Sequence, residues 1–318
     1  MPSRYPSVDL SRIKTISIKK RKSKVHLGDF AKPFDPHKGR FVDYINSLPK
    51  ILAAKELQEF VGYILSSRRR NKPVILLHGA HVVKVGLSPL IIDLLKQSVF
   101  TAVAMNSAAA IHDVESAMWG KTSEDVAENL LDGTFGMSKD TGDFINKTLS
   151  AASREAGIGY GEALGRELLR RKAPFRKVSI LAACYKRSIP VTVHAAIGTD
   201  IVHQQPTMDG AATGELSFRD FKILCKVVSH LVGGGVVMNW GSAVIMPEVF
   251  LKALTVARNL GSRARGFVTA NFDMIQHYRP AMNIIYRPTL DGGKGYHFTG
   301  HHEIMIPLLA AMIKERIR

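Results

Sequence analysis

The chain has 318 residues, 46% of them hydrophobic, and its 44 Lys and Arg against 27 Asp and Glu give a net charge of +17. This composition suffices for one large α/β domain or two smaller ones, and no run approaches the ~18 uninterrupted apolar residues of a membrane helix. Residues 1–24 carry charge where a signal peptide needs an apolar segment. The two cysteines, Cys184 and Cys225, are too few for a disulfide framework, so we expect reduced thiols in a cytoplasmic protein.

The beginning of the chain differs from the rest. We expect residues 1–45 to form a basic, extended arm with one strand-like piece at 13–18, and residues 46–318 to form the folded domain. Helical spacing over 48–67 is stopped by the Asn-Lys-Pro sequence at 71–73.

Five short apolar runs follow, and each gives way abruptly to small or polar residues. The runs are 73–77, 101–105, 189–193, the single residue Val232, and 266–268; the residues after them are 78–81, 106–107, 194–200, 233–235 and 269–271. Short apolar runs separated by helical patterns are typical of buried parallel strands. Ligands bind at the carboxyl ends of such strands, so the sequence predicts one long binding cleft.

The remaining segments complete this alternation. Residues 163–169 and 304–317 have helical spacing, 178–185 fit either a helix or a strand, and the glycines of 133–148 predict a loop with helical pieces. The simplest fold is a doubly wound, mostly parallel α/β sheet with helices on both faces, preceded by the arm.

Two glycine clusters are candidates for contact with a ligand. The cluster at 157–161 resembles a dinucleotide fingerprint, but no strand precedes it, so we interpret it as a flexible turn. Gly233, Gly234 and Gly235 follow an apolar run and would let the backbone approach a ligand. Tight packing between strands explains the same triplet equally well.

Several histidines and lysines are candidates for a metal site, a catalytic nucleophile or binding of nucleic acid. A turn-like Phe-Thr-Gly sequence separates His297 from His301, and the adjacent His301 and His302 would diverge, so we expect no metal site. Lys294 lies in a glycine-rich stretch at 291–295, where loop closure could desolvate its amine and make it a nucleophile. The basic stretches are not interleaved with aromatic residues, which argues against nucleic acid as a partner. Binding of nucleic acid through the arm stays a third interpretation.

The order of the cleft motifs resembles the deoxyhypusine synthase family, in particular its divergent bacterial deoxyhypusine synthase-like branch. The resemblance runs from about Gly28 to the carboxyl terminus and is carried by these segments: 79–81 with 86–87, 106–113, 197–201, 233–237, 269–273, 287–288 and 306–309. It implies a Rossmann-like NAD-binding domain in a homotetramer whose active sites are shared across a dimer interface.

The resemblance also implies roles for individual residues. The positions that would bind NAD are Gly79, Ala80, His81, Asn106, Ser107, His112, Asp113, Thr269, Ala270, His301 and His302. Asp200 and Asp273 match carboxylates that would hold a cationic polyamine, with Trp240 beside them. Asn239 stands where the family has its base histidine and would orient the amine, and Lys294 matches the nucleophile that forms the imine.

From this resemblance we expect an NAD-dependent transferase. It would move an aminoalkyl group from a polyamine such as spermidine, through an imine on the enzyme, to an acceptor amine. The replaced base leaves an alternative, which is a non-enzymatic member that keeps the fold for ligand binding or assembly.

Overall fold

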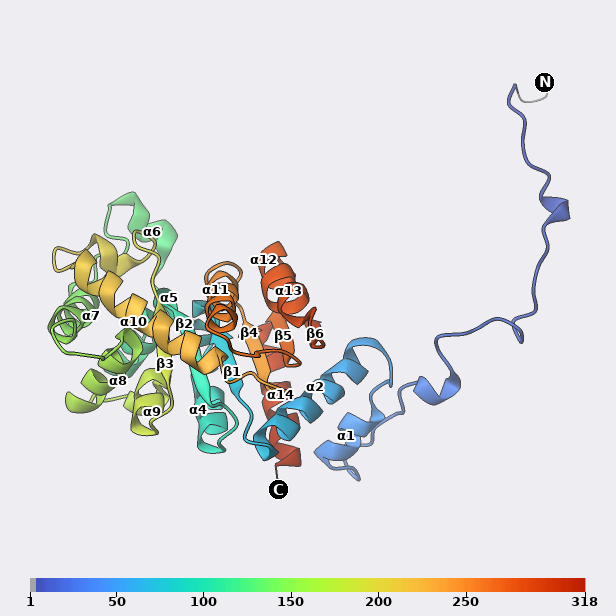
Figure 1. The fold of residues 1–318 in the computed structure, drawn as a ribbon, viewed down its shortest axis with the longest axis horizontal. Helices are drawn as coiled ribbons and strands as arrows, with labels where there is room; N and C mark the ends of the chain where they lie inside the picture. Colours follow the sequence, from blue (N-terminus) through green and yellow to red (C-terminus); the bar gives the residue numbers. More distant parts are fainter. Residues whose placement is uncertain (1–3, 318) are drawn as a thin grey trace. The chain divides into compact units, whose positions relative to one another are not determined.

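The computed structural model describes residues 4–317 and contains a six-stranded, all-parallel sheet in the order β3-β2-β1-β4-β5-β6 (Figure 1). The strands are β1 (Val74–His78), β2 (Ala102–Asn106), β3 (Val191–His194), β4 (Val236–Trp240), β5 (Val268–Asp273) and β6 (Lys294–Thr299). Their register is continuous, so that Leu77 of β1 lies opposite Ala104 of β2 and Asn239 of β4. The predicted doubly wound α/β fold is confirmed.

The predicted strands agree with the structure in part. The runs at 73–77, 101–105 and 189–193 are β1, β2 and β3. The expectation for Val232 is wrong, because Val232 makes only an isolated bridge to Arg265 and the glycine triplet precedes β4 instead of following a strand. The expected strand at 266–268 begins later, since β5 runs from Val268 to Asp273, and β6 was not predicted.

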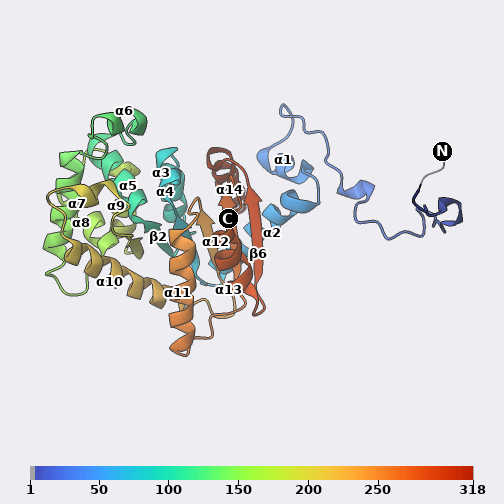
Figure 2. The same ribbon diagram turned by 90° about the horizontal axis from the view of Figure 1, so that it is seen from above.

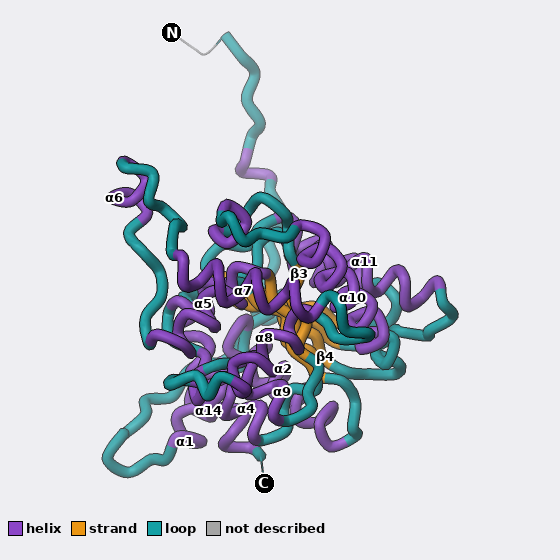
Figure 3. The backbone as a smooth tube through the Cα atoms, turned by 90° about the vertical axis from the view of Figure 1, so that its left-hand side faces the viewer, coloured by secondary structure: helices purple, strands orange, loops and turns teal. Residues whose placement is uncertain are grey.

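Helices connect the strands and surround the sheet (Figure 3). The α-helices are α1 (Phe41–Ser47), α2 (Leu52–Arg69), α3 (Ala80–Lys84), α4 (Ser88–Lys96), α5 (Ser107–Trp119), α6 (Val126–Leu131), α7 (Lys139–Ala152), α8 (Tyr160–Arg170), α9 (Ile180–Lys186), α10 (Gly210–Val228), α11 (Ile245–Asn259), α12 (Tyr278–Pro280), α13 (Arg287–Thr289) and α14 (His302–Arg316). Four 3-10 helices and one π-helix complete them: η1 (Leu10–Arg12), η2 (Leu27–Asp29), η3 (Arg176–Val178), η4 (Ile201–Gln204) and the π-helix η5 (Ala281–Tyr286). Within residues 4–317, no helix is long and apolar enough to span a membrane.

The two faces of the sheet are covered by different helices (Figure 2). On one face, Ile75 of β1 and Val237 of β4 pack against α10, α11 and η5 in a continuous apolar core that includes Phe250. On the other face, the ring of Phe60 from α2 lies 5.9 Å from that of Phe272. Alternate residues of each strand therefore serve different cores, as the period of two requires.

The segment 133–148, expected to be a loop with helical pieces, is more helical than predicted. Residues 139–152 form α7, which buries Phe144, Ile145 and Leu149 although its sequence has few apolar residues. A short amphipathic helix needs only this one apolar stripe when it packs on neighbours such as α8 and α10.

The chain divides into two units, residues 1–55 and 56–318, and the first contains η1, η2 and α1. Inside it, Lys32 N donates to Ser47 O at 2.8 Å and Lys50 N donates to Asp29 O at 2.9 Å. The expected strand-like piece at 13–18 is wrong. Ile13, Ile16 and Ile18 are 60–71% exposed, and no strand lies beside them to accept their backbone hydrogen bonds within residues 4–55.

Candidate functional site

The six strands end along one edge of the sheet, which we call the carboxyl edge; the opposite side is the amino edge. The strand order reverses between β1 and β4, and such a reversal opens the crevice in which doubly wound folds bind ligands. The first residues beyond β1 and β4 are Gly79 and Gly241. These two glycines therefore lie at the point where the fold favours a ligand.

The two glycines bring the backbones of the β1 and β4 loops into contact. Gly79 N donates to Trp240 O at 3.0 Å, and Gly241 N donates to Phe272 O at 3.1 Å. A Cβ on Gly79 would lie 2.2 Å from Gly241 O, and Gly241 has a φ of +63°. Only glycine fits both positions, so the crevice here is lined by bare backbone.

Two histidines stand beside these glycines. The rings of His81 and His302 are 5.4 Å apart, and His302 Nε2 donates to Phe272 O at 3.0 Å. His302 is buried, and its Nδ1 has no hydrogen-bond partner among the residues that the structure describes. Partial burial and the neighbouring His302 lower the pKa of His81. Of the predicted cofactor residues, the structure thus groups 79–81 with His302, whereas His301 is exposed at the start of α14.

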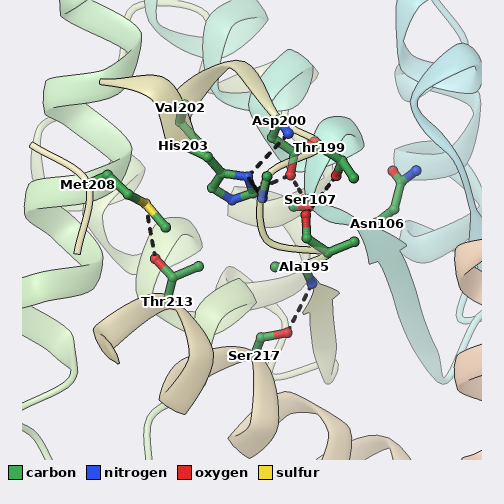
Figure 4. Close-up of polar contacts among 12 residues, drawn as sticks. Asn106, Ser107, Ala195, Thr199, Asp200, Val202, His203, Met208, Thr213 and Ser217 are labelled. Atoms are coloured by element: carbon green, nitrogen blue, oxygen red, sulfur yellow. Dashed lines mark hydrogen bonds and ion pairs between the residues drawn. The ribbon is translucent and has the colours of Figure 1, made fainter. Parts of the chain in front are cut away.

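A second polar group lies at the ends of β2 and β3, around Asp200 (Figure 4). Ser107 Oγ donates to Asp200 Oδ2, and Asn106 Oδ1 caps α5 by accepting from Ala109 N at 3.0 Å. Burial raises the pKa of Asp200.

The Asp200 loop also fixes the orientation of a histidine. The backbone N–H groups of Gly198 and Asp200 both donate to His203 Nδ1, at 3.1 and 3.2 Å. Since Nδ1 accepts, the ring proton is on Nε2, which lies 3.8 Å from Asp200 Oδ2. At 3.8 Å this is too long for a hydrogen bond, and His203 Nε2 is buried with no hydrogen-bond partner within residues 4–317.

Beside Asp200 is a cavity of about 640 Å³, bounded by α3, α5 and the segments around 121–141 and 199–201. This volume is in the range of small-molecule sites. Its charged lining residues are Lys84, Glu115, Lys121, Glu124, Asp140 and Asp200, with His112 among them. Carboxylates outnumber lysines, which favours a cationic ligand.

A hydrogen-bonded chain holds His112 at the wall of this cavity. His112 Nδ1 lies 2.6 Å from Thr122 Oγ1, and Thr122 Oγ1 in turn donates to Glu115 Oε2. Thr141 Oγ1 donates to the other Glu115 oxygen at 3.0 Å. Burial alone would raise the pKa of Glu115, but hydrogen bonds from His112, Thr122 and Thr141 lower it. With Thr122 as acceptor, His112 carries its proton on Nδ1 and leaves Nε2 as an acceptor.

Asp113 does not join this group, although it follows His112 directly. Its carboxylate is fully buried and accepts from Ser179 Oγ at 2.5 Å, Ile180 N at 2.7 Å and Leu181 N at 3.2 Å. Burial raises the pKa of Asp113 to about 6. The side chain thus satisfies backbone amides at the start of α9.

Four predicted residues lie inside strands instead of beyond them. Thr269 and Ala270 are the second and third residues of β5 and are fully buried. Asn239 is within β4 and donates to Ser242 O at 3.0 Å and to Asn271 Oδ1 at 2.7 Å. Trp240 is the last residue of β4 and is also fully buried. The prediction that β5 ends before Thr269 is therefore wrong, because polar side chains continue through the buried part of this strand.

Asp273 and Lys294 lie at opposite edges of the sheet. Asp273 is the last residue of β5, at the carboxyl edge. Lys294 is the first residue of β6, paired with Val268, so the expected mobile glycine loop is wrong at this residue. At 3.3 Å per residue, the six-residue β6 separates Lys294 from the carboxyl edge by about 16 Å.

The ammonium group of Lys294 has its own partners at the amino edge. Lys294 Nζ donates to Glu59 Oε2 at 2.8 Å and lies 4.7 Å from the centre of the Tyr296 ring. The hydrogen bond with Glu59 raises the pKa of Lys294, which keeps the amine protonated. The structure does not bring Lys294 to Asp200 or Asp273.

The residues that hold His112 and Asp200 in place were not predicted from the sequence. Glu115 is three residues after His112, one helical turn along α5, and His203 stands in the same relation to Asp200. These spacings were available as signals. Thr122 and Thr141 lie outside α5, and no spacing in the sequence indicated that they would contact Glu115. Within the described part of the chain, no group of three His, Cys, Asp or Glu side chains could hold a metal ion.

Comparison with known proteins shows the fold. No known protein family and no curated protein matches the sequence. A protein assigned as a deoxyhypusine synthase from Entamoeba histolytica superposes with a TM-score of 0.56 at 11% identity, covering 90% of this chain and 98% of that one. A conserved LOR/SDH protein from Methanococcus maripaludis superposes at 0.52 with 14% identity, covering 82% and 69%.

Two longer proteins share the same fold. AgrE, solved in a ternary complex with ornithine and NAD⁺, superposes at a TM-score of 0.53 with 11% identity over 82% of this chain. ArgZ, a cyanobacterial arginine dihydrolase, does so at 0.54 with 12% identity over 83%. This chain spans 33% of the length of each of these two proteins. At such identities the likeness establishes a Rossmann-like α/β architecture.

Proposed function

We propose that this protein is an NAD-dependent enzyme that transfers an aminoalkyl group from a polyamine to a free acceptor amine. The observation that carries the proposal is the cavity of about 640 Å³ beside Asp200, with its excess of carboxylates at the carboxyl edge of a parallel sheet. The similar folds of a deoxyhypusine synthase and of a protein solved with ornithine and NAD⁺ support it.

Asp200 would bind an ammonium group of the polyamine. Its side chain is only 5% exposed, yet it lines the cavity, and Ser107 and His203 hold its orientation. Burial raises the pKa of Asp200, and a bound cation would reverse that effect by favouring the charged carboxylate. The carboxylate and the cationic substrate therefore stabilise each other in the same pocket.

The residues at the strand reversal fit NAD. The bare backbones of Gly79 and Gly241 permit close approach, and the buried Nδ1 of His302 has no partner among residues 4–317. Residues 79–81, Asn106, Ser107 and His302 would hold the cofactor. NAD, when bound, would accept a hydride from the carbon beside the amine nitrogen and later return it.

His112 is the base that we propose for the amine. Thr122 and Glu115 fix its ring so that Nε2 remains an acceptor at the cavity wall, and the side chain is 16% exposed. His112 would take the amine proton as the substrate is oxidised. Asn239, the residue predicted to orient the amine, instead donates its side-chain amide hydrogens to Ser242 O and Asn271 Oδ1.

Lys294 has no part in the proposed transfer because it lies at the other edge of the sheet. The proposed acceptor is a free amine. In the net reaction, a new carbon–nitrogen bond forms to the acceptor amine and the donor's carbon–nitrogen bond breaks, releasing the remaining amine. Hydride leaves and returns to the same carbon, so no external oxidant is consumed.

The test is turnover with NAD, a panel of polyamines and simple amine acceptors, followed by mass spectrometry of the products. Asp200→Asn should raise the KM for the polyamine about 10- to 100-fold, because a charge-assisted contact is lost. His112→Gln should lower kcat about 100- to 10,000-fold with little change in KM. Asp132→Asn, an exposed carboxylate outside the cavity, is the matched control. Absence of both NAD binding and product formation would refute the proposal.

The second candidate is a binding protein without catalysis. The separation of Lys294 from the cavity and the engagement of Asn239 inside β4 favour it. Binding of NAD and polyamine with no product from any acceptor would select this candidate over the enzyme.

A further inference from the structure

Basic side chains gather at the amino edge of the sheet. Five connections lead from a helix end to the start of a strand there, at 68–73, 96–101, 186–190, 226–235 and 258–267. Every Asp, Glu, Lys or Arg in these five segments is Lys or Arg. A parallel sheet brings all such connections to the same edge, so charges scattered along the sequence become neighbours.

Contacts between the connections show that they lie side by side. Arg68 Nε donates to Gln97 O at 3.1 Å, and Lys72 Nζ donates to Val232 O at 2.7 Å. These cations are bonded to backbone carbonyls, which do not neutralise their charge. A sixth connection contributes Asp291, which lies 3.5 Å from Arg265.

Two grooves at this edge are lined by cations. One, of about 340 Å³, lies between α4 and α9 and is lined by Lys96, Arg176, Lys177, Lys186 and Arg187 over an apolar floor. Neither an Asp nor a Glu is among its lining residues. In the described part of the chain, Lys96, Lys186 and Arg187 form no ion pair.

The second groove lies on the α10 side of the sheet. It measures about 760 Å³ and is lined by Lys72, Lys226 and His230 together with the starts of β1, β2 and β3. Its lining within residues 4–317 also contains no carboxylate. Cationic surface therefore extends around the amino edge from one side of the sheet to the other.

Helix dipoles explain part of this pattern. A cation near a helix carboxyl end is stabilised by about 0.3–1 kcal/mol, and α2, α4, α9, α10 and α11 all end at this edge. The dipole does not require that acidic residues be absent from the intervening loops, nor that unpaired cations line a groove. Unpaired cations repel one another, which is a cost to the isolated protein.

We propose that the amino edge binds the phosphate backbone of a nucleic acid duplex. Six strands spaced about 4.8 Å apart make an edge about 24 Å wide, along which one strand of a duplex presents about seven phosphates. Cations on five of the six connections, with one carboxylate on the sixth, suit a polymer of regularly spaced negative charges. This surface is at the opposite edge from the Asp200 cavity, so it is independent of the proposed enzyme activity.

The test uses the full chain and a fluorescently labelled DNA or RNA duplex, with the Kd measured by anisotropy over a range of salt concentrations. The edge variant is Lys96→Gln/Lys186→Gln/Arg187→Gln. The matched control, Lys139→Gln/Lys147→Gln/Lys252→Gln, removes the same charge from α7 and α11. An arm variant, Lys19→Gln/Lys20→Gln/Arg21→Gln, removes it from residues 1–45.

The expected loss follows from counterion release. Each phosphate contact removed should lower the slope of log K against log salt by about 0.9, which is roughly eightfold in affinity at 0.1 M salt. The edge variant should therefore bind about 8- to 500-fold more weakly, while the control stays near wild type. Equal binding by the edge and control variants would overturn the proposal. Loss confined to the arm variant, or edge-dependent binding to phosphatidylserine vesicles but not to a duplex, would do so as well.

Discussion

Asp220 is a buried carboxylate that should make the protein less stable as the pH rises above neutrality. It lies in α10 with no exposed surface, and its Oδ2 accepts from Gly161 N at 2.9 Å and from Val193 N at 2.6 Å. Its Oδ1 has no partner in the part of the chain that the structure describes. Burial raises the pKa of Asp220 to about 8.

The sign of the effect follows from proton binding. An unfolded Asp loses its proton near pH 3.9, whereas Asp220 in the folded state keeps it up to about pH 8. In this window the folded state holds more protons, so the free energy of unfolding falls as pH rises, by about 1.4 kcal/mol per pH unit.

Other buried groups act at lower pH. Burial lowers the pKa of His78 to about 4 and that of His194 to about 3, so both favour stability as pH rises toward about 6.5. Asp113, with a pKa of about 6, opposes them. Unfolded histidines are half protonated at pH 6.5 and lose the remaining proton by about pH 7.5, so the effect of Asp220 is the difference between the wild type and a variant without this carboxyl group. Between pH 6.5 and 8 that difference should change by about 2 kcal/mol.

The assay is urea unfolding followed by circular dichroism at several pH values between 6.5 and 8. Asp220→Asn keeps an oxygen acceptor for both amides but cannot lose a proton, so the variant should gain stability relative to the wild type as the pH rises over this range. The control Asp209→Asn changes the cap of the same helix and leaves Asp220 in place. A difference in stability between the wild type and Asp220→Asn that stays constant from pH 6.5 to 8 would refute the reasoning.

Further predictions concern Gly79, Asp113 and Lys294. Gly79→Ala places a Cβ 2.2 Å from Gly241 O and should lower the free energy of unfolding by about 1–3 kcal/mol in urea titrations, while an alanine at the open Gly210 should cost less. Asp113→Ala leaves buried donors of α9 unpaired and should cost about 1–3 kcal/mol for each donor, seen as a lower Tm. Lys294→Met breaks a partly exposed ion pair and should change stability by less than about 1 kcal/mol. Borohydride added during turnover should give no adduct on the Lys294 peptide by mass spectrometry, and an adduct there would return Lys294 to the mechanism.

Apolar runs bounded by polar residues were sufficient to predict part of the sheet. β1, β2 and β3 coincide with such runs, and their burial on both faces gives the uninterrupted apolar pattern. β6 was not predicted because its polar residues alternate with aromatic ones, and the glycines before it suggested a loop. β6 is an edge strand with exposed and partly buried positions, whereas the other edge strand, β3, is buried along its whole length, so only β6 has a weak apolar signal.

The predicted end of β5 was too early because polar residues lie inside this strand. Asn271 lies in the buried part of that strand because Asn239 of β4 donates to it, and its own amide donates to Gln276 Oε1 at 2.8 Å. Gln276 Oε1 in turn lies 2.9 Å from His297 Nδ1 of β6. These hydrogen bonds satisfy the buried amides, but they can be predicted only when the strand register is known. The sequence does not specify that register.

The predicted site residues divide into groups for the same reason. Asn106, Ser107 and Asp200 come together because they lie at or beyond the ends of the neighbouring strands β2 and β3. Lys294 was interpreted by its glycine neighbours, which indicate flexibility but not the edge of the sheet at which a residue lies. That placement depends on the direction of β6.

Strand and helix direction together separate the charges of this protein. Helices begin near the carboxyl edge, where their dipoles favour anions such as Asp200, and end at the amino edge, where they favour cations such as Arg187. The two edges are about 16 Å apart, twice the ~8 Å over which physiological salt screens a charge. A cationic amine at one edge and a polyanion at the other would therefore bind with little mutual electrostatic effect. If both proposals hold, substitutions at one edge should therefore leave binding at the other edge unchanged.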